Sequence, residues 1–557
     1  MDKKHLQTDV LVIGAGGAGM YAALSAASSG AGRVLLLDKN MVGRGGATIM
    51  AQMTVAAALG EAEADSWTAH LEDTLTAGRG LCDENLAARL CESGPLRLRE
   101  MDGWGVGWAR ENGHIAQVMA PGHGVPRCCY VDFLNTGPAV AGTLRNRVSR
   151  IGAIQRLSNL TVTDLVVEDG ICRGAVGYDV GTGIVLSIEA GATIIATGGL
   201  TKLYERSSAS NNMAGEGYAL ALNAGAALLD MEFVQFFPIG HLAPRLVGMD
   251  PIMWDPFRYK LGGRLLNGEG EEFVQRYAEA DEGKYKVTRD LATFAIASEV
   301  AAGRGTPHGG AYLSFDHLDQ RTLREAFGPV IDRLADNGID LTETAVEVAP
   351  IAHYHMGGIE VDAGMRSSVP GLYAAGEAVG GANGANRLSG NAITEALVFG
   401  EIAGREAAGY SQGVSGRWPE SRAEKLLSGV FDSDVPAGGD SADRQFKRLQ
   451  QLMWRDVGPF RDAVGLEAAL TAVRTMRATS PGRAPVAPYD MSFAAFVELR
   501  AALVTAEAVM TAAAARTESR GAHQRYDFPE LDDARWHYSQ RIERAGQELI
   551  LTPVARP

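Results

Sequence analysis

Two histidines stand one residue apart in the stretch "AHYHMGG", at positions 353 and 355. Residues spaced by two share one face of a β-strand, so the sequence predicts His353 and His355 on the same side of a strand. Such a pair can bind a metal, transfer a proton or hold an anion. A tetrahedral metal site needs a third ligand at matching geometry. Because no adjacent motif supplies one, we expect no metal here.

A strand–turn–helix pattern opens the chain. An apolar run leads into Gly14-x-Gly16-x-x-Gly19, and the following stretch "RVLLLD" ends at Asp38. Glycines in this arrangement let the backbone approach a pyrophosphate at a helix N-terminus. An acid about 20 residues further on can accept hydrogen bonds from a ribose. The pattern therefore predicts a dinucleotide-binding βαβ unit.

Residues 371–393 favour FAD over NAD as the dinucleotide. "GLYAAGEAVG" predicts a strand that ends near Glu377, whose carboxylate can bond a ribityl hydroxyl of a flavin. "GANGANRLSGNAI" then supplies a loop and a helix start that could cover the isoalloxazine edge. The alternative is that Glu377 is a solvated loop acid, and the residues alone leave both interpretations open.

The elements that must position these residues are divided along the chain. The strand-and-glycine pattern continues to "ATIIATGG" (192–199), is missing from 241–349 and returns at 369–380. This indicates one nucleotide-binding domain split by an insertion. Residues 411–442 are rich in turn-forming residues and predict a linker, and helical patterns follow them.

Composition limits the classes of partner. The chain has 52 Lys and Arg against 67 Asp and Glu, a net charge of −15, which disfavours nucleic acid. An anionic substrate must therefore meet a local positive site. The five cysteines form no C-x-x-C pair, which fits a reducing cytoplasm. No secretory segment and no apolar stretch of about 20 residues is visible, so we expect a cytoplasmic protein without a transmembrane segment.

Several blocks carry a family resemblance. In chain order they are "DVLVIGAGGAG", "DMEFVQF" (230–236), "TRD" (288–290), "HYHMGGIEVD" (353–362), "GLYAAGEAVGGANGANRLSGN" (371–391), "MWRDVGP" (453–459) and "ESRGAH" (518–523). Over nearly its whole length the chain resembles the flavoprotein family of succinate dehydrogenase, fumarate reductase and L-aspartate oxidase.

The resemblance implies an α/β fold. A Rossmann-like FAD-binding domain would be split by an α+β capping domain and followed by a C-terminal helical domain. The expected boundaries are 1–240 and 351–425 for the FAD-binding domain, 241–350 for the capping domain and 440–545 for the helical domain. The resemblance and the glycine pattern together assign these residues to FAD: Gly14, Gly16, Gly17, Gly19, Asp38, Lys39, Gly45, Gly46, Ala47, Thr48, Gly199, Glu377, Asn391 and Ile393.

The family interconverts CH–CH and C=C beside a carboxylate, with hydride transfer to or from flavin N5. The resemblance makes His353 and Arg387 the carboxylate-binding pair and Arg289 the proton-transfer residue. Free arginine is almost never deprotonated, so Arg289 can act only as a relay beside an acid such as Asp290. The alternative for Arg289 and Asp290 is a structural ion pair.

Three further residues are substrate-pocket candidates. His123 lies in the loop "GHGVPR", with Arg127, which resembles a family loop near the flavin and substrate. His355 stands where the family commonly has a small or polar residue, and either substrate contact or packing would explain it. The third candidate, Phe237, marks a departure from the family pattern.

The chain departs from the family in three places. Aligning "RGGATIMAQ" (44–52) puts Ala47 where some members carry the histidine that links FAD, and no histidine lies in 39–60, so we expect non-covalent FAD. "QFFPIG" puts Phe237 where the family has a histidine for a second carboxylate. "WDPFRYKLGG" (254–263) replaces the stretch with the Thr-Glu pair for that same carboxylate, and Met53 and Thr54 replace two glycines.

The lead hypothesis is therefore an FAD-dependent dehydrogenase or reductase for a carboxylic acid other than succinate or fumarate. One alternative is amine oxidation as in L-aspartate oxidase. Others are a succinate dehydrogenase or fumarate reductase flavoprotein subunit with an iron–sulfur partner, or an electron-transfer subunit without substrate chemistry. The substrate's identity, the reaction direction and the electron acceptor or donor stay open.

Overall fold

The N-terminal strand, glycine turn and helix form as the sequence predicts. β1 (Lys3–Ile13) leads into α1 (Gly17–Ser28), and β2 (Val34–Leu37) lies parallel to β1. The inner residues of β1 and β2 form an apolar run without polar alternation, which is typical of a parallel strand covered on both faces. Val10, Leu11 and Val12 are completely buried.

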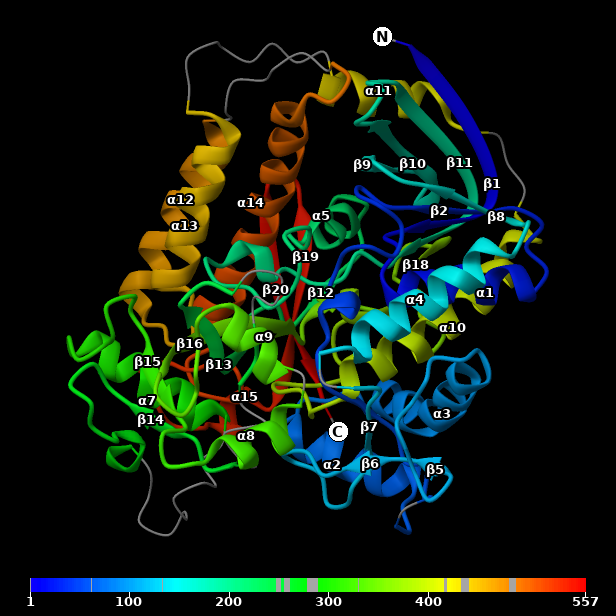
Figure 1. Cartoon of the computed structure of the whole chain (residues 1–557). Helices are drawn as coiled ribbons and strands as arrows, with labels where there is room; N and C mark the ends of the chain where they lie inside the picture. Colours follow the sequence, from blue (N-terminus) through cyan, green and yellow to red (C-terminus); the bar gives the residue numbers. More distant parts are fainter. Residues whose placement is uncertain are drawn as a thin grey trace. The chain divides into compact units, whose positions relative to one another are not determined.

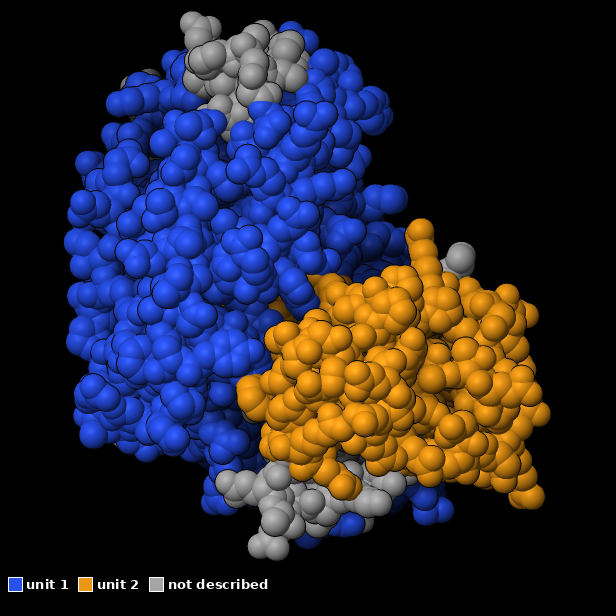
Figure 2. Space-filling view, turned by 90° about the vertical axis from the view of Figure 1, so that its left-hand side faces the viewer, with its two compact units in different colours: residues 1–205, 209–233, 354–557 blue, residues 206–208, 234–353 orange. Residues whose placement is uncertain are grey.

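The structure is a computed structural model. It describes residues 2–61, 63–132, 134–246, 252–254, 261–277, 289–328, 330–414, 418–431, 440–479 and 487–556. The chain folds into two compact units (Figure 2). The first comprises residues 1–205, 209–233 and 354–557, and the second comprises residues 206–208 and 234–353.

The main sheet of the first unit has the order β8-β2-β1-β11-β10-β9, with β18 also beside β11. β1, β2, β8, β11 and β18 pair in parallel, whereas β9, β10 and β11 pair antiparallel. The strands not yet bounded are β8 (Ile154–Leu157), β9 (Leu160–Glu168), β10 (Ile171–Asp179), β11 (Val185–Ile195) and β18 (Leu372–Ala374). β18, far along the chain, joins this sheet, which is what a split FAD-binding domain requires. The predicted α/β class is confirmed.

Small residues let two helices pack closely in this unit. α10 (Asn391–Ser411) lies beside α1 (Figure 1). A Cβ added at Gly404 would lie 2.2 Å from the carbonyl oxygen of Ala22, and one at Gly400 would lie 2.6 Å from that of Ala18. Glycine at both positions therefore allows the two backbones to approach.

The remaining elements of the first unit surround this sheet. Its other helices are α2 (Trp67–Ala77), α3 (Glu84–Gly103), α4 (Thr136–Ser149), α5 (Glu216–Asn223), α11 (Glu420–Phe431), α12 (Ala442–Asp456), α13 (Ala463–Ala478), α14 (Met491–Ala515) and α15 (Asp533–Trp536). Short strands and 3-10 turns are β3 (Val55–Ala56), β4 (Arg110–Glu111), β5 (His114–Ile115), β6 (Gln117–Val118), β7 (Cys128–Cys129), η1 (Thr48–Met50), η2 (Thr201–Leu203) and η4 (Gly376–Ala378).

The C-terminal part contains helices and a strand pair. α12, α13 and α14 pack together (Figure 1), and aspartate or serine side chains cap their N-termini. β19 (Tyr538–Ala545) and β20 (Glu548–Ala555) then form an antiparallel hairpin, which joins a sheet of order β17-β12-β19-β20. The partners are β12 (Leu228–Leu229) and β17 (Gly358–Ile359). This hairpin was not predicted from the sequence.

The second unit is an α+β fold. Its sheet has the order β13-β16-β15-β14. The strands are β13 (Val234–Ala243), β14 (Arg264–Leu266), β15 (Ala311–Ser314) and β16 (Val346–His355), the last of which ends in the first unit. The helical segments are η3 (Val274–Arg276), α7 (Arg289–Ala301), α8 (Gln320–Phe327) and α9 (Val330–Asp336). Trp254 is completely buried, with Phe315 and Phe327 as ring neighbours.

Among the described residues, no helix combines the length and the apolar character needed to cross a bilayer.

Candidate active site

The glycines of the first turn have two different roles: some allow close backbone packing, and one leaves space for a ligand. Gly14 has φ +99°, and a Cβ there would lie 2.4 Å from the carbonyl oxygen of Ala196. A Cβ at Gly19 would lie 1.9 Å from the carbonyl oxygen of Gly14, whereas one at Gly16 would meet nothing within 4 Å. Gly16 also caps α1 without a side-chain hydrogen bond. Open space beside the first helical amides fits a pyrophosphate.

Asp38 ties the second strand to this turn. Its Oδ2 accepts a hydrogen bond from the amide of Ala15 at 3.0 Å, and its Oδ1 accepts one from the amide of Asn40 at 2.8 Å. Burial raises the pKa of its carboxyl above the usual value. Each oxygen has a second lone pair, so the position fits the ribose-binding role that the sequence predicts.

The ammonium of Lys39 is engaged by two carboxylates. Its Nζ donates to Glu498 at 2.8 Å and also to Glu216, and Glu498 in turn accepts from Lys202 at 2.6 Å. This cluster joins the end of β2 to α5 and α14. The structure thus gives the Lys39 side chain a structural ion-pairing role, and it offers no support for a direct contact between this ammonium and FAD.

Residues 45–48 form a loop against the glycine turn. The hydroxyl oxygen of Thr48 accepts from the amide of Gly17 at 3.1 Å. The amide of Gly46, at φ +85°, donates to the hydroxyl of Ser210 at 2.6 Å. A Cβ at Gly46 would meet nothing within 4 Å, so this loop also borders open space.

Glu377 is a buried acid and not a solvated one. Its side chain is 9% exposed, and its Oε1 accepts from the amide of His355 at 3.1 Å. Burial raises the pKa of its carboxyl to about 8. A Cβ at Gly199 would lie 2.2 Å from the same oxygen, so Gly199 is required for Glu377 to approach. The solvated-loop interpretation of Glu377 was wrong.

A second buried acid, Glu395, was not predicted from the sequence. It lies on α10 and is completely buried, and its Oε2 accepts from Asn383 Nδ2 at 2.7 Å and from the hydroxyl of Tyr354 at 2.5 Å. Burial raises the pKa of its carboxyl to about 7. The available signal was a single acid inside the otherwise apolar stretch "AITEALVFG".

Arg387 lies beside this network. It is 5% exposed, its guanidinium lies 4.5 Å from the ring centroid of Tyr354, and its Nη1 donates to the carbonyl of Leu388 at 3.2 Å. Stacking on an aromatic ring fixes the plane of the guanidinium. A planar, oriented guanidinium suits a carboxylate, as the family resemblance implies for this residue.

The start of α10 is held by its side chains. Asn391 is completely buried, its Oδ1 accepts from His70 Nε2 at 2.9 Å, and its Nδ2 donates to Thr74 at 3.2 Å. Ile393 follows as a buried residue. With the Asn391 side chain engaged and Gly390 giving no side-chain cap, the first-turn amides of α10 are the groups that suit a flavin edge.

His123 is a buried neutral histidine. A carbonyl only accepts and a guanidinium only donates, so its Nε2 carries the proton and donates to Ser389 O at 2.7 Å. Its Nδ1 accepts from Arg127 at 3.2 Å. Burial lowers the pKa of its ring to about 4. Arg127 in turn is bonded to Asp65 at 3.0 Å and to Asp73.

His355 is packed inside the first unit. It has no exposed surface, its Nε2 donates to Met231 O at 3.1 Å, and its Nδ1 lies 3.0 Å from the hydroxyl of Tyr218. Burial lowers the pKa of its ring to about 3. Both ring nitrogens are thus used by the protein, so the structure favours the packing role for His355 over substrate contact.

His353 belongs to the second unit. Its Nδ1 lies 2.8 Å from the hydroxyl oxygen of Ser208, which fixes the ring orientation. Phe237 packs on the same ring, with 5.4 Å between centroids. Phe237 also forms an apolar cluster with Met253 and Ile351. Arg387 belongs to the first unit, and its pairing with His353 stays a prediction.

Two predicted features involve residues that are not described. The backbone of Arg289 begins α7, but its side chain, that of Asp290 and residues 255–260 of the replaced stretch lie outside the described residues. Within the described part, no three His, Cys, Asp or Glu residues are grouped as a metal site would require.

Comparisons with known proteins identify the family. A family model described as an FAD binding domain matches residues 9–393, and one described as the fumarate reductase flavoprotein C-term matches residues 446–555. A fumarate reductase (CoM/CoB) chain from Methanothermobacter marburgensis is 34% identical, covering 95% of this chain and 96% of the relative. An L-aspartate oxidase from Caulobacter vibrioides is 34% identical, covering 94% of both chains.

Solved structures agree with these matches. Mycobacterium smegmatis Sdh1 in complex with UQ1 superposes with a TM-score of 0.90 at 32% identity, covering 100% of this chain and 95% of that one. The chain belongs to the flavoprotein family of fumarate reductase, succinate dehydrogenase and L-aspartate oxidase, and it is an FAD-dependent oxidoreductase.

Proposed function

We propose that this enzyme interconverts CH–CH and C=C beside the carboxylate of an organic acid other than succinate or fumarate. The observation that carries the proposal is the packing of Phe237 on His353, with ring centroids 5.4 Å apart. The family uses a histidine at the position of Phe237 for the second carboxylate of a dicarboxylic acid. This chain offers a phenyl ring there.

His353 holds the remaining carboxylate in this proposal. Ser208 bonds Nδ1 of the ring at 2.8 Å, which fixes the orientation of the imidazole. Arg387 is the second carboxylate-binding group, and its guanidinium is oriented by the Tyr354 ring. A fixed imidazole and a fixed guanidinium lose little freedom when a carboxylate binds.

The far end of the substrate is apolar in this proposal. Phe237, Met253 and Ile351 form one apolar cluster in the second unit. A second carboxylate near this cluster would lose charge-assisted hydrogen bonds worth about 1.5–3 kcal/mol each. Each such loss weakens binding roughly ten- to a hundredfold. A monocarboxylate with an apolar, cyclic or aromatic far end avoids this cost.

Bound FAD supplies the hydride acceptor or donor. The chain's own residues orient the substrate and move the proton on its opposite face. Arg289 is our candidate for the proton step, on the family resemblance of "TRD". Because arginine is almost never deprotonated alone, Asp290 is proposed as the acid that lets it act as a relay.

We propose that FAD is held without a covalent bond. Ala47 stands at the position of the linking histidine, and residues 39–60 contain no histidine. Open space beside Gly16 and Gly46 supports a site that binds through backbone groups. Acid precipitation should release the yellow flavin into the supernatant, and colour retained in the pellet would contradict this.

The central experiment is anaerobic reduction of the enzyme-bound flavin by a panel of carboxylic acids, followed by absorbance. We expect bleaching by at least one acid with an apolar or cyclic far end and none by succinate. His353→Ala and Arg387→Ala should each abolish the bleaching while FAD stays bound. Efficient succinate oxidation or fumarate reduction by the purified enzyme would overturn the substrate assignment.

Amine oxidation is a second candidate, because a relative of equal identity is named L-aspartate oxidase. Hydrogen peroxide formed from L-aspartate would favour it. Some relatives are named as subunits, which supports testing for an iron–sulfur partner by co-purification. Electron exchange with such a partner, without any small-molecule substrate, would instead favour an electron-transfer role.

A further inference from the structure

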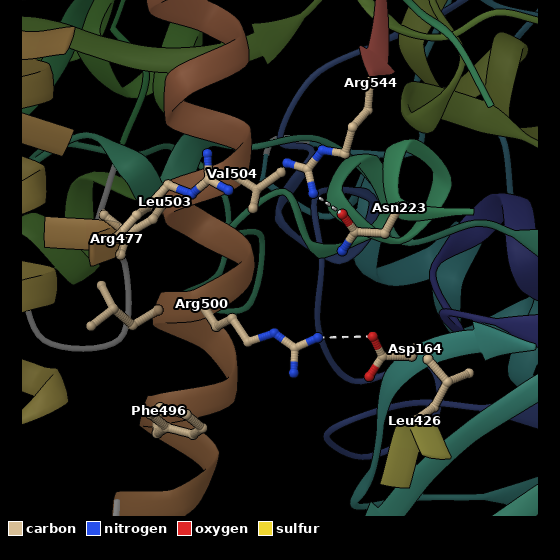
Figure 3. Close-up of a pocket in the computed structure, with 10 residues that line it drawn as sticks. Asp164, Asn223, Leu426, Arg477, Phe496, Arg500, Leu503, Val504 and Arg544 are labelled. Carbon is tan, nitrogen blue, oxygen red and sulfur yellow. Dashed lines mark hydrogen bonds and ion pairs between the residues drawn. The ribbon is translucent and has the colours of Figure 1, made fainter. Parts of the chain in front are cut away.

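A cavity of about 430 Å³ lies within the first unit, and none of its lining residues is assigned to FAD or substrate. Figure 3 shows its lining side chains along α14, with others from α5, α11, α13, β9 and β19. Three of them are arginines, Arg477, Arg500 and Arg544. The lining also contains the acid Asp164 and the amide of Asn223, and apolar side chains complete it.

Arg544 is incompletely paired. Its Nη1 donates to Asn223 at 2.5 Å (Figure 3). Its Nε and Nη2 are buried, and neither has a hydrogen-bond partner among the described residues. These two nitrogens form one edge of the guanidinium, and such an edge binds a carboxylate or phosphate through two parallel hydrogen bonds. Leaving buried donors unsatisfied is unfavourable, so this edge indicates an anionic ligand.

The charges around the cavity agree with an anion. Arg500 donates to Oδ1 of Asp164 at 2.8 Å (Figure 3), which offsets the charge of this acid, while Oδ2 is buried without a hydrogen-bond partner among the described residues. Arg477 is paired with Glu507, which also accepts from Arg474. Burial and repulsion by Arg477 lower the pKa of Arg544, and Glu507 opposes that effect only in part. An anion beside Arg544 would offset both the burial and the repulsion.

The apolar wall sets the shape of the ligand. Leu426, Phe496, Leu499 and Leu503 line the cavity. Phe496 and Leu503 lie seven residues apart on α14, about 10 Å along a helix. We propose that this cavity binds an organic carboxylate, with its carboxylate on the Nε and Nη2 edge of Arg544 and an apolar chain or ring along α14. This ligand is distinct from the substrate of the proposed function.

Isothermal titration of the FAD-loaded enzyme with octanoate and with 4-phenylbutyrate tests the proposal. We expect saturable binding of at least one of them, about tenfold weaker for its neutral amide. Arg544→Gln should weaken binding by about tenfold or more, because it removes the paired edge. Arg474→Gln is the matched control, since Arg474 shares its partner Glu507 with the lining residue Arg477 but does not itself line the cavity.

Further variants separate this site from the active site. The titrations are repeated in His353→Ala, which weakens carboxylate binding at the active site, and octanoate binding in the cavity should persist in that background. Leu503→Trp fills the cavity while keeping every arginine, so it should abolish binding even if Arg544→Gln folds poorly. The proposal is overturned if neither carboxylate binds to His353→Ala, if binding in that background survives both cavity variants, or if octyl phosphate binds more tightly than octanoate.

Discussion

The hydroxyl of Tyr354 donates a hydrogen bond to Oε2 of Glu395, with 2.5 Å between the oxygens. Asn383 donates to the same oxygen at 2.7 Å, whereas Oε1 is buried without a hydrogen-bond partner among the described residues. Burial raises the pKa of this carboxyl to about 7. Two donors on one oxygen therefore do not compensate fully for removing the charge from water.

Glu395 should make the protein less stable as pH rises. Its pKa is about 7 in the folded protein against the usual 4.5, so the folded state binds the extra proton between these values. The stabilisation is complete below the unfolded pKa and is lost as pH rises through the folded one. In the unmodified protein this titration should lower the free energy of unfolding by an amount on the order of 3 kcal/mol, and Glu395→Gln should remove that decrease. Denaturation of the holoenzyme at about pH 5 and about pH 8 measures it.

The control for this experiment is Glu401→Gln, on the same helix α10, where Glu401 pairs with Arg405 near the surface. It should leave the pH dependence as in the unmodified protein. Glu377 contributes a slope of the same sign in both variants, because burial raises its pKa to about 8. Equal pH slopes for Glu395→Gln and Glu401→Gln would contradict the assignment.

Restoring a histidine at Phe237 should shift substrate choice. Phe237→His places an imidazole beside His353, where a second carboxylate would need a donor. We expect succinate or fumarate to bind to Phe237→His at least about tenfold more tightly than to the unmodified enzyme. Flavin absorbance changes on titration measure the affinity. Phe237→Leu, which removes the ring without adding a donor, should show no such gain, and a similar gain would refute the explanation.

Local patterns predicted much of the fold. The glycine turn after β1 was predicted correctly because neighbouring residues specify it. The hairpin of β19 and β20 was missed: the alternating pattern from Tyr538 onwards follows long helices, and its pairing partner β12 lies some 300 residues earlier. Such pairings depend on tertiary contacts, which a single sequence does not reveal.

In the candidate site too, residues within local motifs could be predicted from the sequence, whereas contacts between distant segments could not. Asp38 and Glu377 could be proposed as FAD-binding residues because each follows a strand within a recognisable motif, and that assignment stays a prediction. The bonding of Tyr354, Asn383 and Glu395 could not be read from the chain, because the three residues come from a strand, a loop and a helix. Lys39 was also assigned to FAD, whereas its ammonium pairs with Glu216 and Glu498 from helices far along the chain.

Two glycines of the nucleotide turn should respond differently to alanine. A Cβ at Gly19 would lie 1.9 Å from a backbone oxygen, so Gly19→Ala should impair folding. A Cβ at Gly16 meets no protein atom within 4 Å, so Gly16→Ala should fold but bind FAD at least about tenfold more weakly. Circular dichroism and flavin content after gel filtration distinguish the two, and full flavin content in Gly16→Ala would contradict the assigned pyrophosphate position.

The two histidines of "AHYHMGG" should separate catalysis from stability. His353 is partly exposed with Ser208 on one ring nitrogen, so His353→Ala should lower turnover by at least about a hundredfold while the melting temperature changes little. His355 is completely buried and bonded through both nitrogens. His355→Leu should therefore destabilise the protein by about 1–3 kcal/mol and leave turnover per bound FAD within about threefold of the unmodified value.

The loss of stability at low pH provides a second test of the structural role of His355. The pKa of His355 is lowered to about 3 from 6.5, so the unfolded chain takes up a proton that the folded protein refuses. The stability that the neutral ring contributes is present above about pH 6.5 and is lost as pH falls towards 3. His355→Leu should weaken this acid destabilisation relative to the unmodified protein. If His355→Leu abolished turnover in a protein of unchanged melting temperature and acid sensitivity, His355 would be a substrate-contacting residue after all.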